Sequence, residues 1–461
     1  MNENRTSSNR SWGSRRTFLK ATGTGALATT GLAGCIGTDD GDDGDDGDDS
    51  DDGTADGDDS DGGTTDGESS PDSVTIGQPA SVTGTWDFLQ PAASAATDLA
   101  VQEINDADGP LGAEFAVDRQ DTAVETQQAR ETVRQFVDSG DVVAINGLFS
   151  SEIEPLWDFL QDQEVPIVTP WPGSTFLDTR GGDKGTDDMS DDEWLWRTVI
   201  GDTVHTSGAA RAMLDEAGVE RMAILSATSA GEQGWTEQFT DWYEELGGEI
   251  VNVITAQEGQ ASYQSQLNKL FENDFDAWAL SFALEDAITI IQNWSDGGYG
   301  GQLLMEDGLR DTSLIDEVGE AAEGAWIAAG STQGPNYDQF QSSYQETSDE
   351  DLHTWAVAAY DATNVLALAI HHAGETSPEA IQQSLGDISR SGGTTVTTFA
   401  EGKDALDNGD EINYEGAVTD TDFTQHGNVW GNVVVERITP DGFETDFTIE
   451  SDTLQDEIDE Y

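Results

Sequence analysis

From Val74 onward, short apolar runs alternate with segments in which apolar residues recur every three or four positions. A short apolar run favours a buried strand, and the wider spacing favours an amphipathic helix. The first series of such segments predicts strands at 74–77, 115–117, 142–145 and 165–168, and helices over 92–105, 129–137 and 153–160.

A second series of the same kind begins near Arg197. Strands that alternate with helices at this spacing form parallel sheets with helices on both faces. Two series therefore predict an α/β fold with two doubly wound parallel-sheet lobes. Tryptophans at helical spacing are expected in the cores, whereas those in connecting loops are free to face a ligand. The second series predicts strands at 222–225, 250–254, 277–280 and 303–305, and helices over 209–217, 235–246, 263–270 and 288–294.

Residues 1–34 have the layout of a removable export signal. Arg15 and Arg16 form a twin-arginine pair ahead of an uncharged stretch, 21–34, which is shorter than the roughly 20 apolar residues of a membrane-spanning helix. The ending Leu-Ala-Gly-Cys35 looks like a lipobox, so Cys35 is expected to become the lipidated first residue of the mature protein. The alternative is a chance arginine pair and an ordinary buried cysteine.

The cysteine and charge counts exclude several classes of site and partner. Cys35 is the only cysteine of 461 residues, so neither an intrachain disulfide nor a cysteine-based metal site can form. The chain has 18 Lys and Arg against 93 Asp and Glu, a net charge of −75. This sign excludes nucleic acid and anionic membrane surfaces as partners, so membrane contact is expected through the lipid anchor alone. The composition resembles that of proteins from halophilic archaea; a cation-storage protein is the alternative.

Residues 35–73 are expected to form an acidic, disordered tether. The part from 39 to 70 consists almost wholly of Asp, Gly, Ser and Thr and has no basic residue. Without large apolar side chains it cannot build a core. The alternative of calcium-binding loops lacks the bidentate glutamate that closes such a loop.

Several short segments follow the predicted strands in a fixed order. They include Ser81-Val-Thr-Gly84, Ala100-Val-Gln-Glu-Ile-Asn105 with Gly109-Pro-Leu-Gly112, Asp121-Thr122, Gly147-Leu-Phe-Ser-Ser151, Val165-Pro-Ile-Val-Thr-Pro170 and Trp194-Leu-Trp-Arg-Thr198. In this order and spacing they resemble the extracellular solute-binding proteins of branched-chain amino acid ABC transporters. These are the leucine/isoleucine/valine-binding proteins, which have the periplasmic-binding-protein type I fold.

The resemblance implies that the two lobes are joined by a three-crossover hinge and close over a ligand by hinge motion. The crossings are expected near Arg197, near Gly330 and within 392–413. Lobe 1 would then comprise 74–196 and 331–392, and lobe 2 would comprise 197–330 and 413–461.

Two turns are candidates for binding the carboxylate of a ligand. In open α/β sheets ligands lie beyond the carboxyl ends of the strands, where helix N-termini offer free N–H groups. Ser150 and Ser151 occupy such a turn, and Ser151 with Glu154 also fits a Ser-x-x-Glu capping box. The family's short Ala-Thr or Ser-Thr element corresponds here to 169–174, where Trp171 intrudes and Gly173 and Ser174 match best.

The resemblance places Asp307 where amino acid-binding proteins hold the α-ammonium of the ligand. The alternative is that Asp307 is one more solvated acid in a chain rich in them. Trp86 and Leu89 stand near the first-loop contacts of the family. The tyrosines that such proteins present from the second lobe are missing, so Phe282 is the aromatic residue offered there. An amide, a urea derivative or another small carboxylate therefore stays open as the ligand.

Catalytic patterns find little support. None of the five histidines lies in a His-Glu-x-x-His motif, and there is no Gly-x-Ser-x-Gly. We expect no enzyme activity, no cofactor and no metal, although His371-His372 leaves a metal reading open. Asn293-Trp-Ser295 is a candidate glycosylation site.

These observations lead to one expectation with two alternatives. We expect a monomeric solute-binding protein, exported by the twin-arginine route and lipid-anchored on the outer face of the cell membrane, that captures a small polar solute for an ABC transporter permease. The first alternative is a ligand-sensing receptor ectodomain of the same fold. The second is a cell-surface hydrolase.

Overall fold

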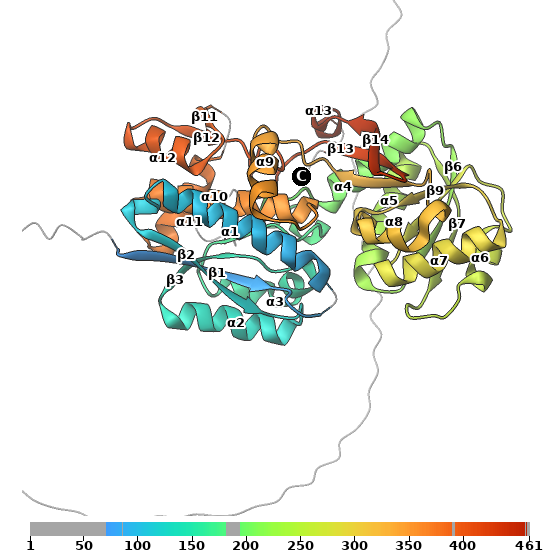
Figure 1. The fold of residues 1–461 in the computed structure, drawn as a ribbon, viewed down its shortest axis with the longest axis horizontal. Coiled ribbons are helices and arrows are strands. Elements are labelled where there is room, and N and C mark those ends of the chain that lie inside the picture. Colours follow the sequence, from blue (N-terminus) through green and yellow to red (C-terminus); the bar gives the residue numbers. More distant parts are fainter. Residues whose placement is uncertain (1–70, 85, 181–193, 390–391, 457, 459–461) are drawn as a thin grey trace, which may run out of the picture. The chain divides into compact units, whose positions relative to one another are not determined.

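The computed structural model describes residues 71–84, 86–180, 194–389, 392–456 and 458 (Figure 1). The predicted export signal and nearly all of the tether, with Arg15, Arg16 and Cys35, lie outside these residues. Among the helices described, none combines the length and apolarity that crossing a bilayer requires.

The first sheet contains five parallel strands in the order β2-β1-β3-β4-β5. Because all five strands are parallel, their carboxyl ends lie at one edge of the sheet. The strands are β1 (Ser73–Ala80), β2 (Glu114–Asp121), β3 (Val142–Asn146), β4 (Ile167–Thr169) and β5 (Leu195–Arg197).

The second sheet repeats this strand order and extends it. Its order is β14-β13-β10-β9-β8-β6-β7, with β6 to β10 parallel, β13 antiparallel to β10, and β14 antiparallel to β13. The strands are β6 (Arg221–Ala227), β7 (Glu249–Ala256), β8 (Ala277–Ser281), β9 (Gln302–Met305), β10 (Trp326–Gly330), β13 (Val433–Thr439) and β14 (Gly442–Ile449).

Helices connect the strands within both series. In the first series they are α1 (Gln90–Asp106), α2 (Thr126–Ser139) and α3 (Ser150–Gln161). In the second they are α4 (Asp202–Arg211), which continues as a π-helical turn over Ala212–Glu216, then α5 (Ala230–Glu245), α6 (Gln264–Leu270), α7 (Leu284–Gly297) and α8 (Thr312–Val318). The prediction of an α/β fold with two parallel-sheet lobes is therefore confirmed.

The segment after β10 adds further helices to the first lobe. It contains α9 (Tyr337–Thr347), α10 (Thr354–Ala373), α11 (Pro378–Asp387) and α12 (Phe399–Asp407), and the short parallel pair β11 (Thr394–Val396) and β12 (Ile412–Tyr414). Helix α13 (Ser451–Gln455) instead follows β14 and packs against α4 of the second lobe. Helix α10 packs against α1, β3 and β4 (Figure 1). Every residue of α10 from Thr354 to Ile370 except Trp355 is buried, which explains why this helix shows no polar face.

The chain passes between the two sheets three times. It leaves the first sheet at Arg197 and the second at Gly330. The third passage differs from the expectation: residues 394–414 form β11, α12 and β12, and α12 packs on α10. The chain re-enters the second sheet only at Val433.

Buried polar contacts tie α10 to its neighbours. The Asp361 carboxylate accepts hydrogen bonds from the amides of Ala417 (2.9 Å) and Val418 (2.7 Å) and from the Tyr414 hydroxyl (2.9 Å). At the end of β3, Asn146 Nδ2 donates to Thr363 Oγ1 at 2.9 Å. These bonds satisfy polar groups in an otherwise apolar core.

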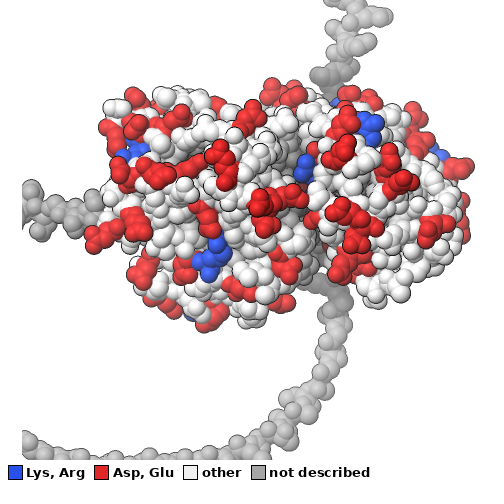
Figure 2. Space-filling view, in the orientation of Figure 1, with Lys and Arg blue, Asp and Glu red and all other residues white. Residues whose placement is uncertain are grey.

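Carboxylates dominate the surface. Figure 2 shows Asp and Glu spread over the visible face of both lobes, with few Lys and Arg between them. The distribution follows from the 93 acidic and 18 basic residues of the chain.

Candidate functional site

A cavity of about 680 Å³ lies at the carboxyl ends of strands from both sheets. One side comes from the segments after β1, β3 and β4, and the other from the segments after β6, β7 and β8. This is the edge where open α/β sheets bind ligands. The lining residues are Trp86, Leu89, Phe149, Ser150, Ser151, Glu154, Trp171, Ser174, Thr175 and Trp355 from the first lobe, and Asp202, Ser229, Gly231, Glu232, Gly234, Glu237, Gln238, Glu258 and Ala283 from the second.

Helix α3 begins at the cavity with Ser150 and Ser151 as its first two residues. Its N-cap is Phe149, whose amide donates to Glu152 Oε2 at 2.8 Å. The predicted capping box of Ser151 with Glu154 is therefore wrong: the glutamate that caps the helix is Glu152, three residues after Phe149. A phenyl ring offers no acceptor in return, so N–H groups of the first turn stay available to a ligand.

The loop after β4 is held against α3 by serine contacts. The Ser174 amide donates to Ser150 Oγ at 3.4 Å, and the Ser174 hydroxyl donates to the Glu154 carboxylate. Ser174 Oγ also accepts from the Phe176 amide at 3.2 Å, which caps the 3₁₀ turn Thr175–Leu177. These contacts fix the position of Ser174 beside the helix N-terminus.

Aromatic and apolar side chains form the first-lobe wall. The rings of Phe149 and Trp171 stack with centroids 4.6 Å apart and planes 17° apart. Trp86 and Leu89 come from the segment between β1 and α1, and the Leu89 carbonyl accepts from His353 Nε2 at 3.0 Å. Apolar walls of this kind give a ligand pocket much of its affinity.

The second-lobe wall is polar and acidic. Glu232 lies in the first turn of α5, and its Oε2 accepts from Ser229 Oγ at 2.5 Å. Burial, and then the nearby carboxylate of Asp307, raise the pKa of Asp202 to about 6. Burial, and then Glu232, also raise the pKa of Glu258. Asp202 is half-buried and Glu258 is exposed, and in both the nearby carboxylate disfavours the ionised form.

The structure brings together most of the residues that the sequence singled out. Those that line the cavity are Trp86, Leu89, Ser150, Ser151, Trp171 and Ser174.

Three residues singled out by the sequence do not line this cavity. Gly173 lies behind it, where its carbonyl accepts from the Asp202 amide at 2.6 Å. Phe282 is 1% exposed and packs edge-on against Tyr263 within the core of the second lobe. Asp307 follows β9, with its Oδ1 3.9 Å from His205 Nδ1. These three residues therefore lie outside the cavity lining.

Other lining residues were missed by sequence reasoning. Asp202 begins α4 directly after the first crossing, and Glu232 lies in the stretch that replaces the family's tyrosines. An acid in the first turn of a helix after a strand is the signal that could have identified both residues. Trp355 reaches the cavity from α10, far along the chain, so no local pattern points to it.

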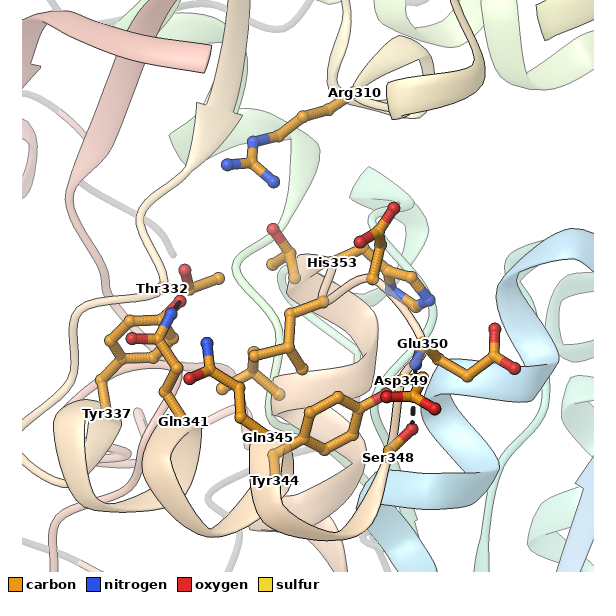
Figure 3. Close-up of a pocket in the computed structure, with 14 residues that line it drawn as sticks. Arg310, Thr332, Tyr337, Gln341, Tyr344, Gln345, Ser348, Asp349, Glu350 and His353 are labelled. Atoms are coloured by element: carbon orange, nitrogen blue, oxygen red, sulfur yellow. Dashed lines mark hydrogen bonds between the residues drawn. The ribbon is translucent and has the colours of Figure 1, made fainter. Parts of the chain in front are cut away.

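A second cavity of about 440 Å³ lies between α9, the start of α10 and Arg310 (Figure 3). Figure 3 shows the guanidinium of Arg310 above His353 and Thr332. Arg310 pairs with Glu436 through Nε and Nη2, at 2.5 and 3.1 Å. None of the predicted site residues lines this cavity.

The histidines and the predicted glycosylation site have structural partners. His371 Nε2 lies 3.1 Å from Asp407 Oδ1, and His372 Nδ1 lies 3.0 Å from Ser384 Oγ. Asn293 Oδ1 accepts from Ser262 Oγ and from the Tyr263 amide. Within the described residues, no group of three His, Cys, Asp or Glu side chains is arranged to hold a metal ion.

Comparison with known proteins identifies relatives of the whole two-lobed region. The model of the periplasmic binding protein family matches residues 73–410. The leucine-, isoleucine-, valine-, threonine-, and alanine-binding protein of Pseudomonas aeruginosa is 20% identical over 289 residues, which cover 62% of this chain and 75% of that protein. The chemotactic signal transduction system substrate-binding protein BasB of Halobacterium salinarum is 23% identical over 372 residues, which cover 80% of this chain and 87% of BasB.

Solved structures show the same fold. The branched-chain amino acid transporter substrate binding protein LivJ from Streptococcus pneumoniae, in complex with isoleucine, superposes with a TM-score of 0.68 at 19% identity. The match covers 82% of this chain and 99% of that one. At this identity, the likeness establishes the fold.

Proposed function

Because the chain belongs to the periplasmic binding protein family, we propose that it captures an amino acid, or a related small amide or carboxylate, outside the cell for an ABC importer. The observation that carries this proposal is the cavity at the carboxyl ends of both sheets, with the N-terminal turn of α3 on one side and that of α5 on the other. Relatives that bind amino acids, by their names, support the ligand class.

In this proposal, Ser150, Ser151 and the first-turn N–H groups of α3 bind the ligand carboxylate, with Ser174 beside them. The helix dipole and the free N–H groups favour an anion at that place. Asp202 and Glu232 offer carboxylates on the opposite wall for an ammonium group. Asp307, the acid suggested by sequence, would act through Asp202, whose pKa it helps to raise along with burial.

The ligand can be identified by titration. We expect calorimetry in molar KCl, over a panel of amino acids, amides and small carboxylates, to find at least one ligand with saturable binding. A hydrogen bond to a charged group contributes about 1.5–3 kcal/mol, so Ser151→Ala should weaken that binding about tenfold or more. Ser342→Ala, on the exposed face of α9, is the matched control. Unchanged affinity of the Ser151 variant would refute the site.

We also propose that Cys35 carries a lipid that anchors the protein after twin-arginine export. Cys35→Ser should release the protein from membranes or leave it unprocessed. Lysines in place of Arg15 and Arg16 should instead retain the precursor inside the cell. A Cys35→Ser protein that is processed and fractionates with membranes as the wild type does would contradict the anchor.

A second candidate function is ligand sensing for chemotaxis. It is favoured by the match to BasB, which covers 87% of that substrate-binding protein. Deletion of the gene separates the two roles, because an importer component is needed for uptake of labelled ligand. Lost attraction to the ligand with unchanged uptake would support sensing instead.

A further inference from the structure

Five carboxylates line the large cavity, and none of the described residues around it is Lys or Arg. Asp202, Glu232, Glu237 and Glu258 come from the second lobe, and Glu154 comes from the first. Glu232 is only 9% exposed, unlike the solvated acids that cover the molecular surface. The α-ammonium of a neutral amino acid would balance only one of these charges.

The acidic wall continues behind the cavity. Glu306 and Asp307 follow β9, and burial raises the pKa of Glu306 well above its usual value, with Glu232 and Asp307 adding to the effect. Burial, and then the carboxylate of Asp307, likewise raise the pKa of Asp202. Arg197 partly offsets the field at Asp202, but its guanidinium is bound to Asp178 at 2.5 Å. This part of the fold therefore disfavours the ionised form of its carboxyl groups, as functional sites often do.

The first-lobe wall offers groups that complement this charge. Trp171 is 4% exposed and contributes its ring to the cavity wall. The faces of Trp86, Phe149, Trp171 and Trp355 are also surfaces to which cations are attracted.

We propose that the ligand is a cationic amino acid, with an ammonium or guanidinium group on its side chain. This inference rests on the proposed function and specifies its substrate class. The ligand carboxylate binds at the N-terminus of α3 beside Trp171. The α-ammonium and the cationic side chain bind among Asp202, Glu232 and Glu258, so that the two lobes hold opposite ends of one ligand.

Arginine and citrulline form a matched pair of probes, because they have nearly the same shape but only arginine carries the side-chain charge. Calorimetry in molar KCl should show arginine binding at least tenfold more tightly than citrulline, and lysine more tightly than norleucine. Glu232→Gln should remove most of this preference. Glu244→Gln, on the exposed side of the same helix α5, should leave it intact.

The outcomes separate this inference from the function on which it rests. Equal binding of arginine and citrulline to the wild type would overturn the inference, whatever the variants do. Tight leucine binding without a preference for cations would do the same but leave the amino acid-binding function standing. Absence of binding to every amino acid, amide and carboxylate tested would overturn both.

Discussion

The guanidinium of Arg197 and the carboxylate of Asp178 form a buried ion pair, with Nη2 and Oδ1 2.5 Å apart. Nη1 of the same arginine lies 3.1–3.3 Å from the carbonyl oxygens of Pro172, Gly173 and Ser174. Arg197 is the last residue of β5, where the chain leaves the first sheet. One side chain thus joins the start of the hinge to the loop that places Ser174 in the cavity.

Replacing Arg197 should destabilise the fold and weaken ligand binding together. Removal of one partner of a buried ion pair costs about 3–5 kcal/mol, so Arg197→Met should lower the free energy of unfolding by that order. The free energy of unfolding of Arg197→Lys should lie between those of the wild type and Arg197→Met, because a single ammonium group cannot make all the contacts of the planar guanidinium. Denaturant titration in molar KCl gives the stability of each variant.

The matched control for Arg197 is Arg221→Lys. Arg221 Nε lies 3.0 Å from Glu249 Oε2, and both side chains are substantially exposed. Exposed ion pairs contribute about 0–1 kcal/mol, so this variant should stay close to the wild type. Equal losses at Arg197 and Arg221 would contradict the special role of the buried pair.

Gly173→Ala should weaken ligand binding by moving the Asp202 carboxylate, although Gly173 itself does not line the cavity. A Cβ at Gly173 would lie 2.1 Å from Asp202 Oδ1, so the carboxylate would have to rotate away. Loss of one charged hydrogen bond predicts binding of the cationic ligand about tenfold weaker or more, measured by calorimetry. Gly308→Ala is the control, because a Cβ there meets no atom within 4 Å and Gly308 does not line the cavity. Equal affinity of the two variants would contradict the role given to Asp202.

Apart from β5, the sequence predicted the strands and helices of both series up to Met305 because each element has its own apolar pattern. Three elements show where such patterns fail. β5 has only two apolar residues before Arg197, too short a run to indicate a strand, and α10 is buried nearly all round, which removes its polar face. The hairpin β13–β14 adds antiparallel pairings to a parallel sheet. An expectation of strictly alternating helices and strands does not include such a hairpin.

The first-lobe half of the site was predictable for a related reason. Ser150, Ser151 and Ser174 follow strands whose carboxyl ends meet at one edge of a parallel sheet, so their proximity follows from topology. The exact cap of α3 was not predictable, because both Glu152 and Glu154 could serve and only tertiary contacts separate them. The Ser174 hydroxyl donates to the Glu154 carboxylate, and the Phe149 amide donates to Glu152 instead. In the second lobe, the position of Asp202 and Glu232 in the first turns of α4 and α5 is the signal that the sequence offers, and the structure adds the low exposure of Glu232.

His353 should make stability fall as the pH is lowered. Its Nδ1 accepts from the Ala356 amide and its Nε2 donates to the Leu89 carbonyl, which requires the neutral ring. Burial lowers the pKa of His353 from 6.5 to about 4. The unfolded chain therefore binds a proton that the native protein does not, and stability is lost between pH 6.5 and 4 by at most about 3 kcal/mol.

The measurement for His353 is the difference between wild type and His353→Asn in denaturant titrations across this pH range. Asparagine keeps the N-cap of α10 but does not titrate. The difference is needed because Asp361 and Asp202 have pKa values raised from 3.8 to about 6. Their contribution to the free energy of unfolding falls as the pH rises through this range, which is opposite to the effect of His353. A difference that does not change with pH would contradict the neutral buried ring.

Low salt should unfold the two-lobed domain. The chain has a net charge of −75, and the acids crowd its surface (Figure 2). Lowering the salt from 1 M to 0.1 M lengthens the screening distance from about 3 to about 10 Å, so neighbouring carboxylates repel one another more strongly. Circular dichroism during dialysis should show a loss of structure, and replacing the exposed pair Glu244 and Glu245 on α5 by glutamine should move the transition to lower salt. Sucrose in place of KCl serves as the control, because it carries no charge to screen the acids. An unchanged spectrum in low salt would refute the dependence on screening.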